Sequence, residues 1–303
     1  MPFVTRVLRN ASVSTLKTYF NHHGIDLGEP MNWQSRSNTI LAKRVLHSLE
    51  SLGADAYSDI SNDFERIDAM TDEIGRTAIE ASLAGKQALE VLDNAYDRAL
   101  WLLLNDSASF RRAEETRYAD HYRQGRMWAG YVGTKGLPVS KNPKHHEEFI
   151  SWIKSRFKCT DVHMDVFERT RPCINENLSH LVQVVIYRNG MPDNILDFEN
   201  GALIRKKYRP VLEFVITYES RTGVIEVLAR EKASRARLAR MFAEVMLQKP
   251  ILGVLLPLRE YDLSALLKRT SFPTDPQDGI AVTVVESLGL KHLEDKKDRK
   301  SVV

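Results

Sequence analysis

The sequence predicts an α + α+β fold class: an N-terminal all-α helical bundle followed by a mainly antiparallel sheet domain covered by helices. Three observations support this. Up to about residue 135, apolar residues recur at the three- and four-residue spacing of helices. After residue 136, short β-rich runs alternate with tight turns. Between them, the stretch GYVGTKGLPVSKNPKHH contains three Gly and two Pro, which is typical of a linker.

This change of pattern gives the predicted domain boundaries. A chain of 303 residues is long enough for two domains, each with its own core. We expect an all-α domain over residues 1–135, a linker over 136–144 and an α+β domain over 145–292. The last residues, 293–303, are highly charged and predict a flexible tail.

The helical half should contain six helices joined by short connections. The first runs from Ser12 to His23, with Ser12 or Ser14 as its N-cap and Gly24 after its end. The others are expected over residues 39–52, 55–74, 77–84, 86–104 and 107–128.

The second half begins with a helix over residues 145–157. Strands are expected over 161–169 and 181–187, in a hairpin of 194–198 with 202–207, and in a hairpin of 211–219 with 224–229. A helix over 231–248 and a last strand over 280–290 complete it. In the run VLEFVITYE, Phe214 and Ile216 share one face of the strand, and Glu213 and Val215 share the other.

Composition bounds the class of protein. The chain is 43% hydrophobic and 27% charged, and it has two cysteines, so we expect a soluble, cytoplasmic protein without disulfides. No apolar run approaches the ~20 residues of a membrane span, so we expect no membrane association. Residues 1–135 carry 16 Lys and Arg against 18 Asp and Glu, and residues 136–303 carry 27 against 22. This bias is smaller than that of a dedicated nucleic-acid binder.

The sequence contains none of the motifs GxxxxGK[ST], GxGxxG, GxSxG or HExxH, and we expect no cofactor. One set of soft donors could hold zinc, but its gaps match none of the usual spacings, and buried free cysteines are the competing explanation. The set is Cys159, His163, Cys173 and His180.

Carboxylates of the predicted sheet form a second candidate site, because neighbouring carboxylates can hold a divalent ion that activates water. The candidates are Asp197, Glu199, Glu213 and Glu226. Restriction-type nucleases resemble this arrangement but carry a Glu-x-Lys pair, whereas Val215 stands two residues after Glu213. The lysine that would support the nucleophile is therefore missing, and we assign no nuclease role to these residues from the resemblance. The competing interpretation is that Glu213 and Glu226 face solvent.

Two basic regions are candidate surfaces for nucleic acid or another partner. The densest is IRKKYRP, with Arg205, Lys206, Lys207 and Arg209, which would bind phosphates or else keep an edge strand from aberrant pairing. The second is the sixth helix, with Arg117, Arg123 and Trp128. There, the competing interpretation is pairing of the arginines with acids of the same helix.

These observations favour a non-enzymatic regulatory or adaptor protein. A protein partner or a homo-oligomer is the expected partner, and nucleic acid is a second candidate. The alternative is a metal-dependent, nuclease-like hydrolase that uses the sheet carboxylates. The two hypotheses differ in whether Asp197, Glu199, Glu213 and Glu226 converge.

Overall fold

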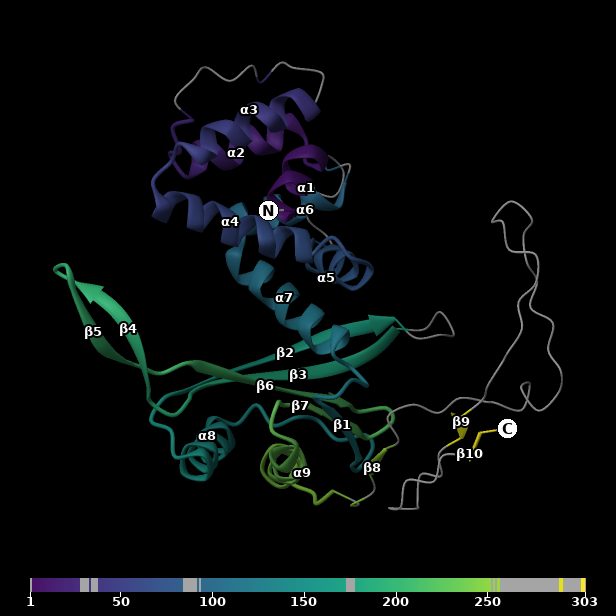
Figure 1. Cartoon of the computed structure of the whole chain (residues 1–303). Coiled ribbons are helices and arrows are strands. Elements are labelled where there is room, and N and C mark those ends of the chain that lie inside the picture. The colour runs from purple at the N-terminus through teal and green to yellow at the C-terminus, as the bar shows by residue number, and fades with distance from the viewer. Residues whose placement is uncertain are drawn as a thin grey trace. The chain divides into compact units, whose positions relative to one another are not determined.

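The computed structural model has a mixed α+β fold, in which N-terminal helices precede a mostly antiparallel sheet, as predicted (Figure 1). Contacts divide the chain into two compact units, Met1–Leu258 and Arg259–Val303. The predicted boundary at 136–144 falls inside the first unit and stays a prediction. The structure describes residues 2–27, 33, 38–83, 92, 94–172, 178–251, 253, 255–256, 289–290 and 301–302.

The N-terminal helices surround one apolar core. Ser12 is the N-cap of the second helix, as predicted, and its hydroxyl accepts a hydrogen bond from the Thr15 amide at 3.2 Å. Leu16, Phe20 and Phe64 are among the fully buried core residues. The helices are α1 (Pro2–Asn10), α2 (Val13–His22), α3 (Asn38–Glu50), α4 (Ala54–Ala69), α5 (Glu73–Leu83), α6 (Ala95–Asn105) and α7 (Ser107–His121).

Several helix predictions need correction. Helix α5 begins at Glu73 and not near residue 77, and α6 begins at Ala95, after its N-cap Asn94, and not near residue 86. Residues 2–10 form α1, which was not predicted, because nine residues are too few to establish a helical period. The helix predicted over 55–74 stops at Ala69, and the Asp72 carboxylate accepts a hydrogen bond from the Gly75 amide at 2.7 Å as α5 begins. A Cβ at Gly75 would lie 2.6 Å from the Met70 carbonyl, so this tight turn requires glycine.

The sixth predicted helix is also too long. It corresponds to α7, which ends at His121, and Trp128 begins strand β1 (Trp128–Val132) instead of ending the helix. Gln124 has a φ of 58°, a left-handed conformation that stops the helix. The sequence WAGYV contains two small residues, which hide the alternation of a strand.

The main sheet has six antiparallel strands in the order β2-β3-β6-β7-β1-β8. The hairpin predicted over 211–229 is confirmed as β6 and β7, and Gly223 in its turn has a φ of 76°. Besides β1, the strands are β2 (Val162–Pro172), β3 (Leu178–Asn189), β6 (Val211–Glu219), β7 (Val224–Leu228) and β8 (Leu255–Leu256).

Helices cover both faces of this sheet (Figure 1). On one face lie α8 (Pro143–Phe157) and α9 (Lys232–Met241), which continues into a π-helical turn, η2 (Phe242–Met246). Phe149 of α8 and Phe242 of η2 pack there against Phe214, Ile216 and other buried apolar residues. Helix α7 lies on the opposite face.

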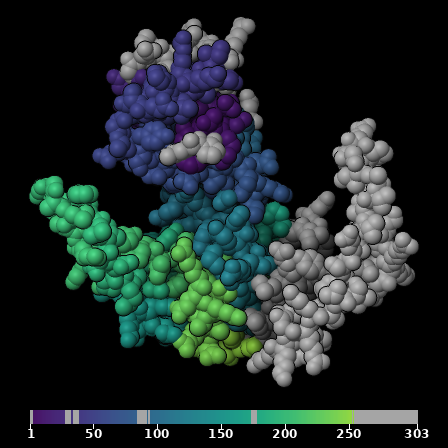
Figure 2. All heavy atoms as spheres, viewed as in Figure 1, coloured from purple at the N-terminus to yellow at the C-terminus, as the bar shows by residue number. Residues whose placement is uncertain are grey.

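A second, two-stranded sheet projects from the first unit as a ribbon (Figures 1 and 2). It consists of β4 (Asp193–Glu199) and β5 (Ala202–Tyr208), the hairpin predicted over 194–207. Asn200 and Gly201 form its turn with φ values of 52° and 78°, which suits a two-residue hairpin turn.

Little of the second unit belongs to the described residues. There, β9 (Gly289–Leu290) pairs with β10 (Ser301–Val302). Most of the strand predicted over 280–290 and of the tail predicted over 293–303 lies outside the described residues. Within the described part of the chain, no helix has the length and apolar character needed to cross a membrane.

Candidate functional site

Helix α7 contacts the sheet through polar as well as apolar side chains. Asp106 is its N-cap, and the Asp106 carboxylate accepts a hydrogen bond from the Ser109 amide at 3.0 Å. Ala119 packs with Val185 and Val215 in a small apolar cluster. Around this cluster the same face carries arginines and carboxylates, and some of these groups form hydrogen bonds between α7 and the sheet.

A network of ion pairs joins the end of α7 to β2 and β7. Arg169 donates to both carboxylate oxygens of Asp120 at 2.8 Å, and Arg171 donates to Asp120 at 2.8 Å. Arg171 also reaches Glu226 at 2.9 Å, and Arg123 reaches the other oxygen of Glu226 at 2.6 Å. The Arg169 and Glu226 side chains are only 7% and 8% exposed. Each of these three arginines and two carboxylates has a partner of opposite charge, which offsets the cost of burial.

The network has an electrostatic consequence for its acid. Burial alone would raise the pKa of Asp120, but hydrogen bonds and charges from Arg169 and Arg171 hold that pKa below its usual value. Arg169 also donates to Gln183 at 2.6 Å, and Gln183 in turn donates to the Glu115 carbonyl at 3.0 Å. The network thus extends along α7 to Glu115.

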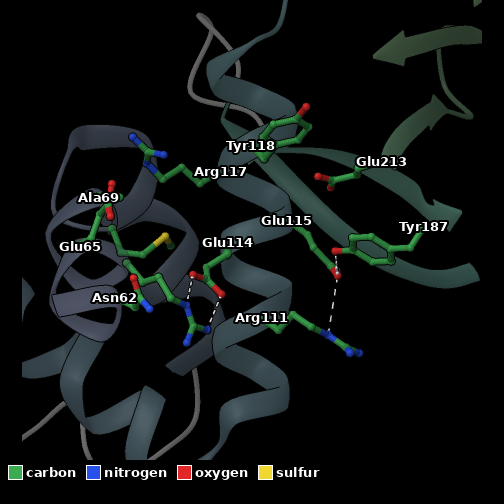
Figure 3. Close-up of a pocket in the computed structure, with 12 residues that line it drawn as sticks. Asn62, Glu65, Ala69, Arg111, Glu114, Glu115, Arg117, Tyr118, Tyr187 and Glu213 are labelled. Atoms are coloured by element: carbon green, nitrogen blue, oxygen red, sulfur yellow. Dashed lines mark hydrogen bonds and ion pairs between the residues drawn. The ribbon is translucent and has the colours of Figure 1, made fainter. Parts of the chain in front are cut away.

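A cavity of about 550 Å³ lies where α4, α7 and the sheet meet (Figure 3). Glu115 and Tyr118 of α7 line it, together with Tyr187 of β3 and Glu213 of β6. Glu213 is half-buried and faces α7, so the expectation that it faces solvent is wrong. Burial, and then the charge of Glu115, raise the pKa of Glu213 to about 7.

The four sheet carboxylates proposed for metal binding occupy separate places. Asp197 and Glu199 lie on the projecting ribbon, and Glu213 lines the cavity. Glu226 is held by Arg123 and Arg171, so it does not face solvent either. In the part of the chain that the structure describes, no group of three or more His, Cys, Asp or Glu residues is arranged to hold a metal ion.

The zinc candidates are also spread apart. His163 stands opposite Tyr187 and His180 opposite Thr170, so the two histidines lie toward opposite ends of the β2–β3 ladder. Cys159 is a buried free cysteine just after α8. Cys173 lies outside the described residues. The structure therefore does not bring the described donors together.

The candidate residues of the sixth helix are held by contacts within the chain. Arg117 pairs with Asp72 at 2.6 Å, and Arg123 pairs with Glu226 at 2.6 Å. Trp128 is 6% exposed and lies in the sheet. These arginines pair with other elements, so the competing expectation of pairing within the helix is wrong for both of them.

The basic residues of the ribbon are exposed, but they point to two faces. Residues that pair across a ladder share a face. Lys207 pairs with Asn194 and Arg205 with Leu196, so these four lie on one face. Lys206 lies on the other face, where its Nζ is 3.4 Å from the Asp197 carboxylate. Arg209, beyond β5, donates to the Gly190 carbonyl at 3.5 Å.

Exposed apolar side chains share the face of Arg205 and Lys207. Leu196, Phe198 and Leu203 are 59%, 74% and 60% exposed, and Phe198 pairs with Leu203 near the tip. We call the surface made by Asn194, Leu196, Phe198, Leu203, Arg205 and Lys207 the basic face of the ribbon. These apolar residues are not among the sites predicted from the sequence, although pairing the two strands around Asn200 and Gly201 places them beside the cations.

The carboxylates of the ribbon lie on its opposite face. Asp193 pairs with Tyr208, Asp197 with Ile204 and Glu199 with Ala202. The basic face therefore carries two cations and no carboxylate, whereas the opposite face carries three carboxylates and one cation. No known protein-family model matches this sequence, and no curated protein matches it significantly.

Proposed function

We propose that this protein is an adaptor that binds nucleic acid through the basic face of the β4–β5 ribbon. The observation that carries the proposal is the separation of charge between the two faces. Arg205 and Lys207 are exposed beside Leu196, Phe198 and Leu203, with no carboxylate on that face. Phosphates would be attracted to this face and repelled by the other.

The dimensions of the ribbon suit a nucleic-acid groove. A seven-residue strand is roughly 24 Å long, and the ~12 Å major groove of duplex DNA admits a two-stranded ribbon. Phe198 and Leu203 lie near the tip. Apolar side chains of this kind insert between bases in proteins that kink DNA, and aromatic rings stack on unpaired bases. Arg205 and Lys207, farther from the tip, would then bind phosphates of the nucleic-acid backbone.

Two neighbouring lysines provide the test, because Lys206 and Lys207 lie on opposite faces of the same strand. Binding of a labelled duplex and a labelled single strand is measured by fluorescence anisotropy over a salt series. Lys207→Ala should weaken binding and reduce the salt slope by about one unit. Lys206→Ala removes the same charge from the opposite face and should change binding far less.

A third variant separates the apolar contact from the charges. Phe198→Ala should weaken binding without changing the salt slope, because stacking and insertion release no counterions. Failure of the unmodified protein to bind either probe at ~50 mM salt would refute the proposal. Equal losses for Lys206→Ala and Lys207→Ala would show that any binding is not oriented by the basic face.

A further inference from the structure

The cavity between α4, α7 and the sheet has an imbalance of charge. Three arginines line it, but each of them is already paired with a carboxylate, two of which come from outside the cavity lining. The pairs are Arg66 with Glu114 at 2.8 Å, Arg111 with Asp165 at 3.0 Å and Arg117 with Asp72 at 2.6 Å. Of the other three carboxylates in the lining, Glu65 is exposed, whereas Glu115 and Glu213 are at least partly buried and have no cation at hydrogen-bond distance among the described residues.

Glu115 is the more buried of the two. It is 3% exposed, and its Oε1 accepts a hydrogen bond from the Tyr187 hydroxyl at 2.7 Å. The nearest cation to that oxygen is Arg111, at 3.7 Å. Its other oxygen, Oε2, is buried and has no hydrogen-bond partner in the described part of the chain. A buried carboxylate oxygen without a partner is costly, so a donor supplied by a ligand would stabilise it.

Glu213 faces the same space from the sheet (Figure 3). It stands opposite Tyr187 in the β3–β6 ladder, and Tyr118 of α7 also lines the cavity. Within the described residues, its carboxylate has neither a hydrogen bond nor an ion pair. Glu115, Glu213 and the two phenols therefore surround the place where a cation is lacking.

We propose that this cavity binds the ammonium group of a small alkylamine between Glu115 and Glu213. An ammonium carries three donors, which can satisfy Glu115 Oε2 and Glu213 together. The rings of Tyr118 and Tyr187 provide the aromatic surface that favours cations. Ala69 and Met70 on the α4 side of the cavity offer apolar contacts to the carbon chain.

The chemistry of the site favours an ammonium over a metal ion. Calcium takes six to eight oxygen ligands, and structural zinc takes four nitrogen, sulfur or oxygen ligands. In the cavity, Glu115 already accepts a hydrogen bond from Tyr187, and the described residues hold no group of three or more metal-binding side chains. An ammonium is satisfied by two carboxylates and needs no further charge.

Binding should depend on pH, because a cation favours the ionised form of Glu213. The titratable groups around Glu213 are Glu115 and Tyr118 on α7 and Tyr187 on β3. Two cations lie near them: Arg111 acts on Glu115 and Tyr187, and Arg230, just after β7, acts on Tyr118. Burial raises the pKa of both phenols above its usual value, so they stay neutral near pH 7. Burial raises the pKa of Glu115 as well, so both carboxyls lose protons as the pH rises, and amine affinity should rise between pH 5 and pH 8 with release of protons.

The test uses butylamine and 1-butanol, which share a carbon chain and differ in charge. Saturation-transfer NMR with the full chain should detect butylamine and not 1-butanol. Glu213→Gln and Glu115→Gln should each weaken butylamine binding by roughly tenfold, the size of one charge-assisted hydrogen bond. Glu213→Gln should also reduce the pH dependence, because one of the two titrating carboxyls is gone.

Two controls make the result decisive. Glu147→Gln removes an exposed carboxylate on α8, across the sheet from the cavity, and should leave butylamine binding unchanged. Thermal unfolding of each variant establishes that it is folded before binding is compared. Equal signals from butylamine and 1-butanol would overturn the proposal, as would unchanged butylamine binding by the folded Glu213→Gln variant.

Discussion

The two faces of the main sheet are built in opposite ways. Along β6, Phe214, Ile216 and Tyr218 point to the face covered by α8 and α9, where the buried side chains of the sheet are apolar. Glu213 and Thr217 point to the face covered by α7. On that face, buried apolar residues form a small cluster, and arginines and carboxylates surround it.

The difference shows that apolar contacts and ion pairs have different roles in this fold. Apolar packing is favourable over a range of orientations, because it depends mainly on the area that is removed from water. The Asp120–Arg169 pair is bidentate, and such a pair is satisfied only in one geometry. We therefore expect the α8 and α9 face to contribute most of the stability. The α7 face should fix the position of the N-terminal helices against the sheet.

The largest effect should come from the apolar face. Phe214 is 3% exposed, and its ring packs on that of Phe157 at 4.9 Å between centroids. Phe214→Ala should lower the free energy of unfolding by about 3–5 kcal/mol, because it leaves a cavity in the core. Urea unfolding followed by circular dichroism measures this loss. A smaller loss of unfolding free energy than that caused by Arg169→Ala on the α7 face would contradict the comparison.

A smaller but still large effect is expected from the ion network. Arg169→Ala leaves Asp120 buried with one fewer partner and should cost about 3 kcal/mol. Glu168, the next residue along β2, is the matched control, since it is 73% exposed and pairs with Lys141. Glu168→Ala should change stability by less than about 0.5 kcal/mol in the same urea experiment. Similar losses for both variants would mean that burial does not distinguish the two charges.

The smallest effect should come from Glu213 and should depend on pH. The pKa of its carboxyl rises from an ordinary 4.5 to about 7 on folding, so between these values the folded protein holds the extra proton. Stability contributed by this group is therefore present below about pH 4.5 and is lost as pH rises through 7. Glu213→Gln should be nearly neutral at pH 5 and stabilising by about 1–2 kcal/mol at pH 8.

Urea midpoints of the parent protein and Glu213→Gln at the two pH values measure the difference directly. A stabilising effect of the same size at both pH values would show that the carboxyl does not titrate in this range. A destabilising effect at pH 8 would show that the ionised carboxylate has a partner after all.

Much of the fold follows from local patterns in the sequence. Alternation over Val211–Glu219 and the turn at Gly223 predict the β6–β7 hairpin, and Ser12 with Gly24 delimits α2. These signals are reliable because each depends on residues that are near in sequence. The errors occur where local signals are weak. The short helix α1 and the glycine-containing strand β1 each need distant partners to form.

The candidate sites depend on long-range contacts. The alternation along β6 shows that Glu213 and Phe214 lie on opposite faces, but it does not say which helix covers each face. A solvated face and a face covered by the polar side of α7 give the same pattern of residues. Packing of α7 buries Glu213 beside Glu115 and joins Glu226 to Arg123 and Arg171, which lie 103 and 55 residues away in sequence. The burial and charge of these groups come from that packing, because desolvation and pairing depend on which elements meet in space.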